Sequence, residues 1–261
     1  MPDDNELQDD NSLNSIVESG TEIVGAVTGA AIGLIGGPAA SIAGAIAGPV
    51  VAKGLKKLGR EIRQQQIAPK QEARIGGAIA VAIKRMQQLK DSGNEVRDDL
   101  FFSGDSHDFE EVAEGVSLTA KDEFEEKKIP YIGNLLAGIA YSSGINKSYA
   151  NFLNKLAGDL TFRQLVLLRI FSETSLFSLR SSSLADADGR MTVVANVTGV
   201  LTEIKDLESR SLISSGTTLF ALPQIIPSRL RTEGAGSTLV QLMCLKEIPD
   251  TDIQEVVALL T

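Results

Sequence analysis

The sequence has no Trp, one Cys and one His among 261 residues, and aromatic residues make up only 5% of it. Because Cys244 is alone, neither a disulfide framework nor a cysteine metal cluster is expected. Cys244 follows Met243 in an apolar run and is interpreted as a core residue. His107 lies in a polar segment without partners at metal-ligand or acid–base spacing, so we interpret it as a surface residue. We therefore expect no enzyme activity, no cofactor and no metal site.

Basic residues are also few: 25 Lys and Arg stand against 34 Asp and Glu, giving a net charge of −9. This balance disfavours a general nucleic-acid binder, which normally has a basic face. Residues 1–22 contain no Lys or Arg and read as a disordered acidic tail. The tail lacks the basic n-region of a secretory signal peptide, so we expect a cytoplasmic origin.

Charge is missing altogether from residues 23–52, where glycines recur at four-residue spacing. In a helix this spacing places them on one face. The glycines are Gly25, Gly29, Gly33, Gly37, Gly44 and Gly48. Such a stripe lets a second helix approach to backbone contact, as in transmembrane pairs, whereas each glycine costs about 1 kcal/mol relative to Ala in an exposed helix. We interpret the run as a glycine zipper for homo-oligomerisation in a membrane.

Two prolines interrupt this run, at Gly36-Gly37-Pro38 and at Gly48-Pro49. A continuous helix over it would be about 45 Å long, enough to cross a hydrocarbon core of about 30 Å. A hairpin turning at 36–38 would have arms of about 20 Å, too short to cross. Both topologies stay open, as does a buried Ala/Gly-rich hairpin in a soluble protein.

Basic residues dominate the stretch that follows, residues 53–90. The positive-inside rule would place this side of the apolar run in the cytoplasm. We expect contacts with anionic lipid headgroups, at about 1 kcal/mol each. The expected contact residues are Lys53, Lys56, Lys57 and Arg60.

Apolar periodicity predicts a largely helical middle region, 53–157. The expected helices cover residues 53–68, 70–90, 107–114, 128–140 and 148–156, with Pro130 near the first turn of the fourth. Dense carboxylates within this region are interpreted as a solvated helix face rather than a Mg²⁺ or acid–base site. They could also pair with the basic segment 53–90 and hold the molecule closed. The carboxylates are Asp108, Glu110, Glu111, Glu114, Asp122, Glu123, Glu125 and Glu126.

Residues 158–261 have the element order of a winged-helix module. Helices are expected at 162–171, 193–209, 233–245 and 253–260, with Thr161, Thr232 and Asp250 as the caps of the first, third and fourth. Strand-like runs at 211–214 and 217–222 predict a short β-hairpin. Arg210, Arg229 and Arg231 form a small basic patch for nucleic acid, although a protein-contact or structural role is favoured because acidic residues outnumber basic ones here.

A resemblance to a known family rests on five short runs between Lys127 and Phe171. The runs are Lys128-Ile129-Pro130, Leu135-Leu136-Ala137, Ala150-Asn151, Leu156-Ala157 and Gln164-Leu165. This stretch resembles the helical region of a bacterial family linked to abortive infection, the Abi-alpha or DUF4393-like proteins. The resemblance implies a defence protein that acts during phage infection, and it supplies no catalytic residue.

Together these patterns predict a mainly α-helical bacterial protein in four segments: 1–22, 23–52, 53–157 and 158–261. We expect it at the inner membrane with most of the chain cytoplasmic. As a phage-defence effector it would oligomerise through the zipper, perturb the membrane and respond to a protein trigger. The alternative is a soluble regulatory or interaction protein that uses its winged helix on DNA or on a protein partner.

Overall fold

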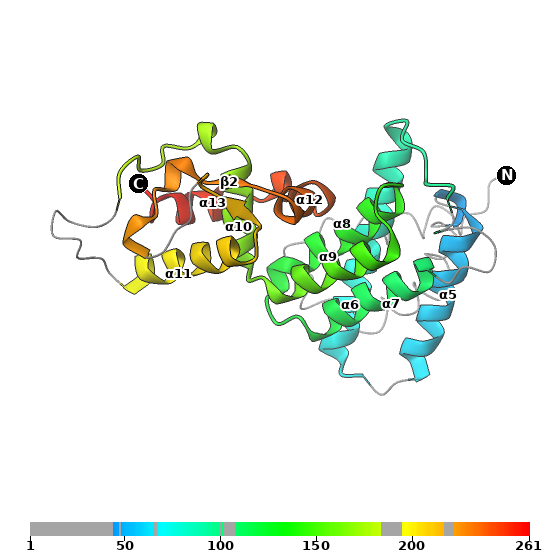
Figure 1. The fold of residues 1–261 in the computed structure, drawn as a ribbon. Coiled ribbons are helices and arrows are strands. Elements are labelled where there is room, and N and C mark those ends of the chain that lie inside the picture. The colour runs from blue at the N-terminus through cyan, green and yellow to red at the C-terminus, as the bar shows by residue number, and fades with distance from the viewer. Residues whose placement is uncertain are drawn as a thin grey trace. The chain divides into compact units, whose positions relative to one another are not determined.

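A computed structural model of the chain describes residues 44–46, 48–64, 67–99, 101, 108–183, 195–216 and 222–261. The chain divides into two compact units between Asp159 and Leu160 (Figure 1). Over the described residues both are mainly helical, which confirms the expected fold class. The acidic tail and the zipper up to residue 43 lie outside the described residues, and with them Gly25, Gly29, Gly33 and Gly37.

The first unit is built from helices that overlap the predicted ones. They are α5 (Pro49–Gln64), α6 (Pro69–Asp91), α7 (Asp108–Asp122), the 3-10 turn η1 (Glu126–Lys128), α8 (Ile129–Ala140) and α9 (Lys147–Asp159). Helix α6 matches its prediction to within one residue at each end. Pro69 and Pro130 lie in the first turns of α6 and α8, where their missing N–H groups cost no helical hydrogen bond. Among the helices with described side chains, none has the length and apolar character needed to cross a membrane.

Helix α7 is twice as long as the short acidic helix expected there. Its apolar residues recur at helical spacing, and Phe109, Val112, Val116 and Ala120 are fully buried. The helix continues because this apolar stripe is buried, although the polar composition of the stretch predicted a loop.

Two pairs of helices in this unit run side by side in the same direction. Gly133 of α8 lies against Ala78 of α6, and eight residues later Tyr141 donates its hydroxyl to the Met86 carbonyl at 3.1 Å. In α7 and α9, Gly115 lies against Asn154, and four residues later in both helices Thr119 lies against Gly158. Because the contacts advance in the same direction along both helices of a pair, the two helices are parallel.

The second unit is centred on α10 (Phe162–Ser172), which packs against the other elements around it. These are α11 (Ala195–Ser209), β2 (Arg231–Thr232), α12 (Ala235–Leu242), the 3-10 turn η5 (Leu245–Glu247) and α13 (Asp250–Val257). The capping role of Thr161 is confirmed: its hydroxyl accepts the Gln164 N–H at 3.1 Å, and the Gln164 side chain accepts the Thr161 N–H at 2.9 Å. This capping box begins a helix whose central residues Leu165, Leu168 and Phe171 are fully buried.

The two-stranded sheet differs from the predicted hairpin. Strand β1 (Ile213–Ser214) falls in the first expected run, but it pairs antiparallel with β2, with Ile213 opposite Thr232 and Ser214 opposite Arg231. The second expected run lies outside the described residues except for Leu222, which begins the 3-10 turn η3 (Leu222–Gln224). A second such turn, η4 (Pro227–Arg229), precedes β2. The assignment of this unit as a winged helix stays a prediction.

Two predicted helix caps in this unit are wrong. Thr232 belongs to β2 because the chain beyond it packs on the residue before β1: the Glu233 N–H donates to the Leu212 carbonyl at 2.9 Å. Gly234 then precedes α12. Asp250 lies in the first turn of α13 rather than before it, since the Pro249 carbonyl accepts the Asp252 N–H at 3.1 Å.

Candidate functional site

The basic helix α5 forms ion pairs with Glu110, in the first turn of α7. Lys57 Nζ lies 3.0 Å from Glu110 Oε2, and Lys53 Nζ lies 3.8 Å from Glu110 Oε1. The two lysines are four residues apart and therefore share one face of α5. The Glu110 side chain is only 9% exposed, whereas those of Lys53 and Lys57 are 68% and 44% exposed. The pair thus lies at the rim of the helix contact, with the ammonium groups toward water.

Beneath these charges the contact is apolar. Val51 and Leu55 of α5 are buried, and so is Phe109 of α7. The Phe109 ring packs on Gly54, where an added Cβ would lie 3.1 Å from Cδ1 of the ring. Helix α5 is therefore held by an apolar side and bordered by a basic one.

The four predicted headgroup contacts are distributed around this helix. Lys53 and Lys57 face Glu110, Lys56 is exposed, and the side chain of Arg60 lies outside the described residues. Lipid contact at these positions stays a prediction. The expected pairing between the acidic cluster and the basic segment is confirmed here.

The same turn of α7 also binds α9. Lys147 Nζ lies 3.0 Å from Asp108 Oδ1 and 3.1 Å from Glu111 Oε2, and Asn151 donates to Glu111 at 2.9 Å. Hydrogen bonds to Asp108 first and Glu111 second raise the pKa of Lys147 above its ordinary value. The carboxylates on this turn thus have different partners: Glu110 binds α5, whereas Asp108 and Glu111 bind α9.

A second acidic residue pairs with the basic segment at the far end of the cluster. Glu126 Oε1 lies 3.0 Å from Lys70 Nζ and 3.7 Å from Arg74 Nη2 of α6. These pairs place the start of α6 beside the start of α8, in agreement with the parallel packing of the two helices. They extend the confirmed pairing of acidic and basic segments.

Glu123 does not belong to a solvated face, contrary to the sequence interpretation. It forms an ion pair with Lys128, and both side chains are almost completely buried. Lys128 Nζ also donates to the Gly158 carbonyl at 3.0 Å, and Glu123 accepts the Glu125 N–H at 2.9 Å. Apolar periodicity cannot reveal such a pair, because it marks only the apolar positions of a helix.

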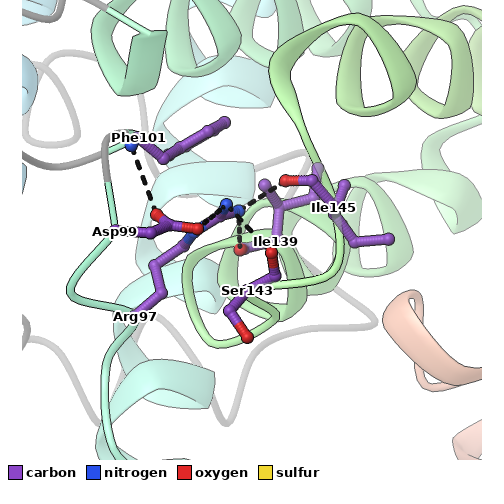
Figure 2. A network of polar contacts seen from close by, with 6 residues as sticks. All are labelled: Arg97, Asp99, Phe101, Ile139, Ser143 and Ile145. Carbon is purple, nitrogen blue, oxygen red and sulfur yellow. Dashed lines mark hydrogen bonds and ion pairs between the residues drawn. The ribbon is translucent and has the colours of Figure 1, made fainter.

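Arg97 is a second buried charge that the sequence did not single out (Figure 2). Its guanidinium forms a two-point pair with Asp99, at 2.8 and 2.6 Å, and lies 4.1 Å from the centre of the Phe101 ring. It also donates to the Ile145 carbonyl at 2.6 Å and the Ile139 carbonyl at 3.4 Å, near the end of α8. The hydrogen bond from Arg97 holds the pKa of Asp99 below its ordinary value.

These contacts use the guanidinium inside the unit, where it links Asp99 and Phe101 to the end of α8. Figure 2 shows the carbonyl groups and the Asp99 carboxylate converging on it. The arrangement indicates a structural clamp rather than a site for an external anion.

The two zipper glycines that the structure describes lie at a helix break. Gly48 has φ of +90°, its N–H donates to the Gly44 carbonyl at 3.0 Å, and α5 begins at the next residue. The expected interruption at Gly48-Pro49 is confirmed. A Cβ added to Gly44 would lie 2.8 Å from Cβ of Ala52, so Gly44 also packs within this turn. A role of the zipper glycines in oligomerisation stays a prediction.

The predicted basic patch of the second unit is partly neutralised. Arg210 Nε lies 3.0 Å from Asp206 Oδ2, which also accepts a hydrogen bond from Gln164 at 2.8 Å. Arg231 donates to the carbonyls of Ser228 and Leu230, and Arg229 is exposed. These contacts are consistent with the favoured structural role, and nucleic-acid contact stays a prediction.

The remaining candidate residues are Cys244 and His107. Cys244 is buried, which confirms the core interpretation, although it lies after α12 with φ of +54° rather than inside a helix. His107 lies outside the described residues. Within the described part of the chain, no group of three or more His, Cys, Asp and Glu side chains is arranged to hold a metal ion.

No family model, curated protein or solved structure matches the chain in comparisons with known proteins. The resemblance to the Abi-alpha proteins therefore stays a prediction that rests on the short runs between Lys127 and Phe171.

Proposed function

We propose that this chain is a membrane-associated bacterial effector of phage defence. Its glycine-rich segment 23–52 oligomerises in the inner membrane and perturbs it, while the helical units remain on the cytoplasmic side. The observation that carries the proposal is the docking of α5: this basic helix begins at Pro49, inside the end of the apolar run, and binds α7 through Lys53, Lys57 and Glu110.

This connection supports a link between the apolar segment and the helical unit. Because α5 continues from the segment after one helix break at Gly48, a movement of the segment is transmitted to the contact between α5 and α7. The basic rim of α5 suits anionic headgroups at the membrane surface. The resemblance to abortive-infection proteins suggests that a phage-derived or phage-induced protein is the trigger.

The first test of this proposal is fractionation of cells that express the full chain. Membranes are washed with carbonate, and the chain is compared with a variant lacking residues 23–47, which keeps α5 whole. We expect the full chain to stay in the washed membranes and the deleted variant to leave them. A full chain recovered in the soluble fraction contradicts the proposal.

The zipper itself is tested by substitution on and off the glycine face. Gly29→Leu with Gly33→Leu blocks close helix approach, and Ala26→Leu with Ala30→Leu adds the same bulk beside the stripe. We expect the glycine variant to lose toxicity and cross-linked oligomers, and the alanine variant to keep both. Equal toxicity in the two variants would exclude the zipper mechanism.

The second candidate function is that of a soluble regulatory protein. It is favoured by one observation: residues 160–261 form a compact unit with its own buried core around α10. Such a unit could bind DNA or a protein partner through a winged helix. Deletion of residues 23–47 would then leave both the cytosolic location and the activity unchanged.

A further inference from the structure

The two lysines on the face of α5 already hold an anion. The Glu110 carboxylate lies between Lys53 and Lys57, with one oxygen toward each ammonium group. A lipid phosphate offers the same chemistry: an anion whose oxygen atoms form ion pairs with two ammonium groups at once. Glu110 therefore occupies the position that a headgroup phosphate would take on this face.

We infer that Glu110 is an internal competitor of anionic lipid, and that α5 exchanges this carboxylate for headgroup phosphates when the protein meets an anionic membrane. The inference rests on the proposed function and adds to it the residue that regulates lipid binding. The occupant of the α5 face is thus a membrane rich in anionic lipid, reached from the side on which both ammonium groups are exposed.

The exchange is feasible because the two interactions are of similar strength. Ion pairs between exposed groups contribute about 0 to 1 kcal/mol, and the low exposure of Glu110 places its pairs toward the upper end of that range. A lysine near an anionic membrane gains about 1 kcal/mol. Neither state dominates, so the local density of anionic lipid decides between them. The sequence supplies that proximity, because the apolar run ends at residue 52 and Lys53 is the next residue.

Removal of the competing charge should strengthen membrane binding. Full-length protein is mixed with vesicles of phosphatidylglycerol and phosphatidylethanolamine, and bound protein is measured by flotation. We expect E110Q to bind about fivefold to tenfold more tightly than the unmodified chain. The matched control is E111Q, which removes the neighbouring charge from Lys147 rather than from α5 and should bind like the unmodified chain.

A second set of measurements separates this effect from misfolding and from general charge. Circular dichroism establishes that E110Q retains its helices. Adding K53Q and K57Q to E110Q should abolish the gain, since the ammonium groups of these two lysines are its source. The gain should also be absent with phosphatidylcholine vesicles. Inorganic phosphate should compete no better than chloride at equal ionic strength if the ligand is a membrane surface.

The outcomes distinguish this inference from the proposed function. If the unmodified chain binds anionic vesicles and E110Q binds them no more tightly, Glu110 is not a competitor, while the membrane proposal stands. If E111Q gains as much as E110Q, general charge explains the result and the inference is wrong. If the chain neither binds vesicles nor stays in carbonate-washed membranes, the proposed function fails and the inference with it.

Discussion

Helices α8 and α5 are both attached to the same unit, but by different means. Helix α8 approaches α6 to backbone contact: a Cβ at Gly133 would lie 2.4 Å from the Ala78 carbonyl oxygen. Helix α5 approaches α7 through a side chain, with the Phe109 ring on Gly54. The ion pairs also differ. Glu123 and Lys128, which precede α8, are both buried, whereas Lys53 and Lys57 of α5 are exposed.

This difference indicates which part of the unit is able to move. Close backbone packing is lost on a small displacement, and separation of a buried ion pair leaves uncompensated charges in the interior. A ring contact bordered by exposed ion pairs tolerates displacement and responds to salt and to competing anions. The pair α6 and α8 is thus the scaffold, and α5 is the element suited to exchange partners.

The largest expected effect comes from breaking the buried ion pair. Lys128→Met leaves Glu123 buried without its cation and should lower the free energy of unfolding by about 3 to 5 kcal/mol. Urea denaturation measures it. Lys121→Met is the control, because the Asp122 partner of Lys121 is largely exposed and little should be lost. An equal loss in the two variants would show that burial does not distinguish these pairs.

Gly133→Ala should destabilise the unit by about 1 to 3 kcal/mol. A methyl group there meets the backbone of α6, which cannot yield as a side chain can, and this overpacking outweighs the helix propensity that Ala adds. Urea denaturation again measures the change. Gly144→Ala, which places a methyl group in open space, should stay within about 0.5 kcal/mol of the unmodified protein. A neutral Gly133→Ala would refute the rigid scaffold.

Gly54→Ala should change the stability by less than about 0.5 kcal/mol. The added methyl group lies 3.1 Å from the edge of the Phe109 ring, so the ring must shift by a few tenths of an ångström. The cost of that shift is offset by the gain of about 1 kcal/mol that Ala brings to a helix. A loss as large as that of Gly133→Ala would mean that both contacts are equally rigid.

The smallest effect is expected from salt. At 1 M NaCl the screening length falls to about 3 Å, which weakens the exposed pairs of Lys53 and Lys57 with Glu110. Amide hydrogen exchange over α5 should then accelerate by about twofold, while exchange over α6 and α8 stays unchanged. Uniform acceleration across the three helices would contradict the separation of a rigid part from a movable one.

The helices were largely predictable because their signals are local. Apolar periodicity and Pro69 predicted α6 over 70–90, and the structure has it at Pro69–Asp91. Thr161 was predicted as the cap of a helix starting at Phe162, which is where α10 begins, and the structure adds that Gln164 completes a capping box there. The sequence also predicted a helix at the start of α7, but only the structure showed, through the buried stripe, that this helix continues to Asp122.

Two of the errors concern residues whose surroundings depend on groups that are distant in sequence. Thr232 has the chemistry of a helix cap, yet the Leu212 backbone binds the chain beside it and makes it a strand residue. Glu123 has the composition of a surface residue, and only the position of Lys128 and the Gly158 carbonyl buries it. A local pattern carries no information about such distant groups.

The sequence by itself determined the mainly helical class, most helix boundaries and the break at Gly48-Pro49, because backbone sterics, caps and apolar periodicity act over a few residues. Only the tertiary structure decided which charges are buried, which glycine permits backbone contact and which carboxylate holds α5. Glu110 and Glu111 are adjacent and chemically identical, but they bind different helices. Successive helical positions point about 100° apart, so packing alone assigns Glu110 to α5 and Glu111 to α9.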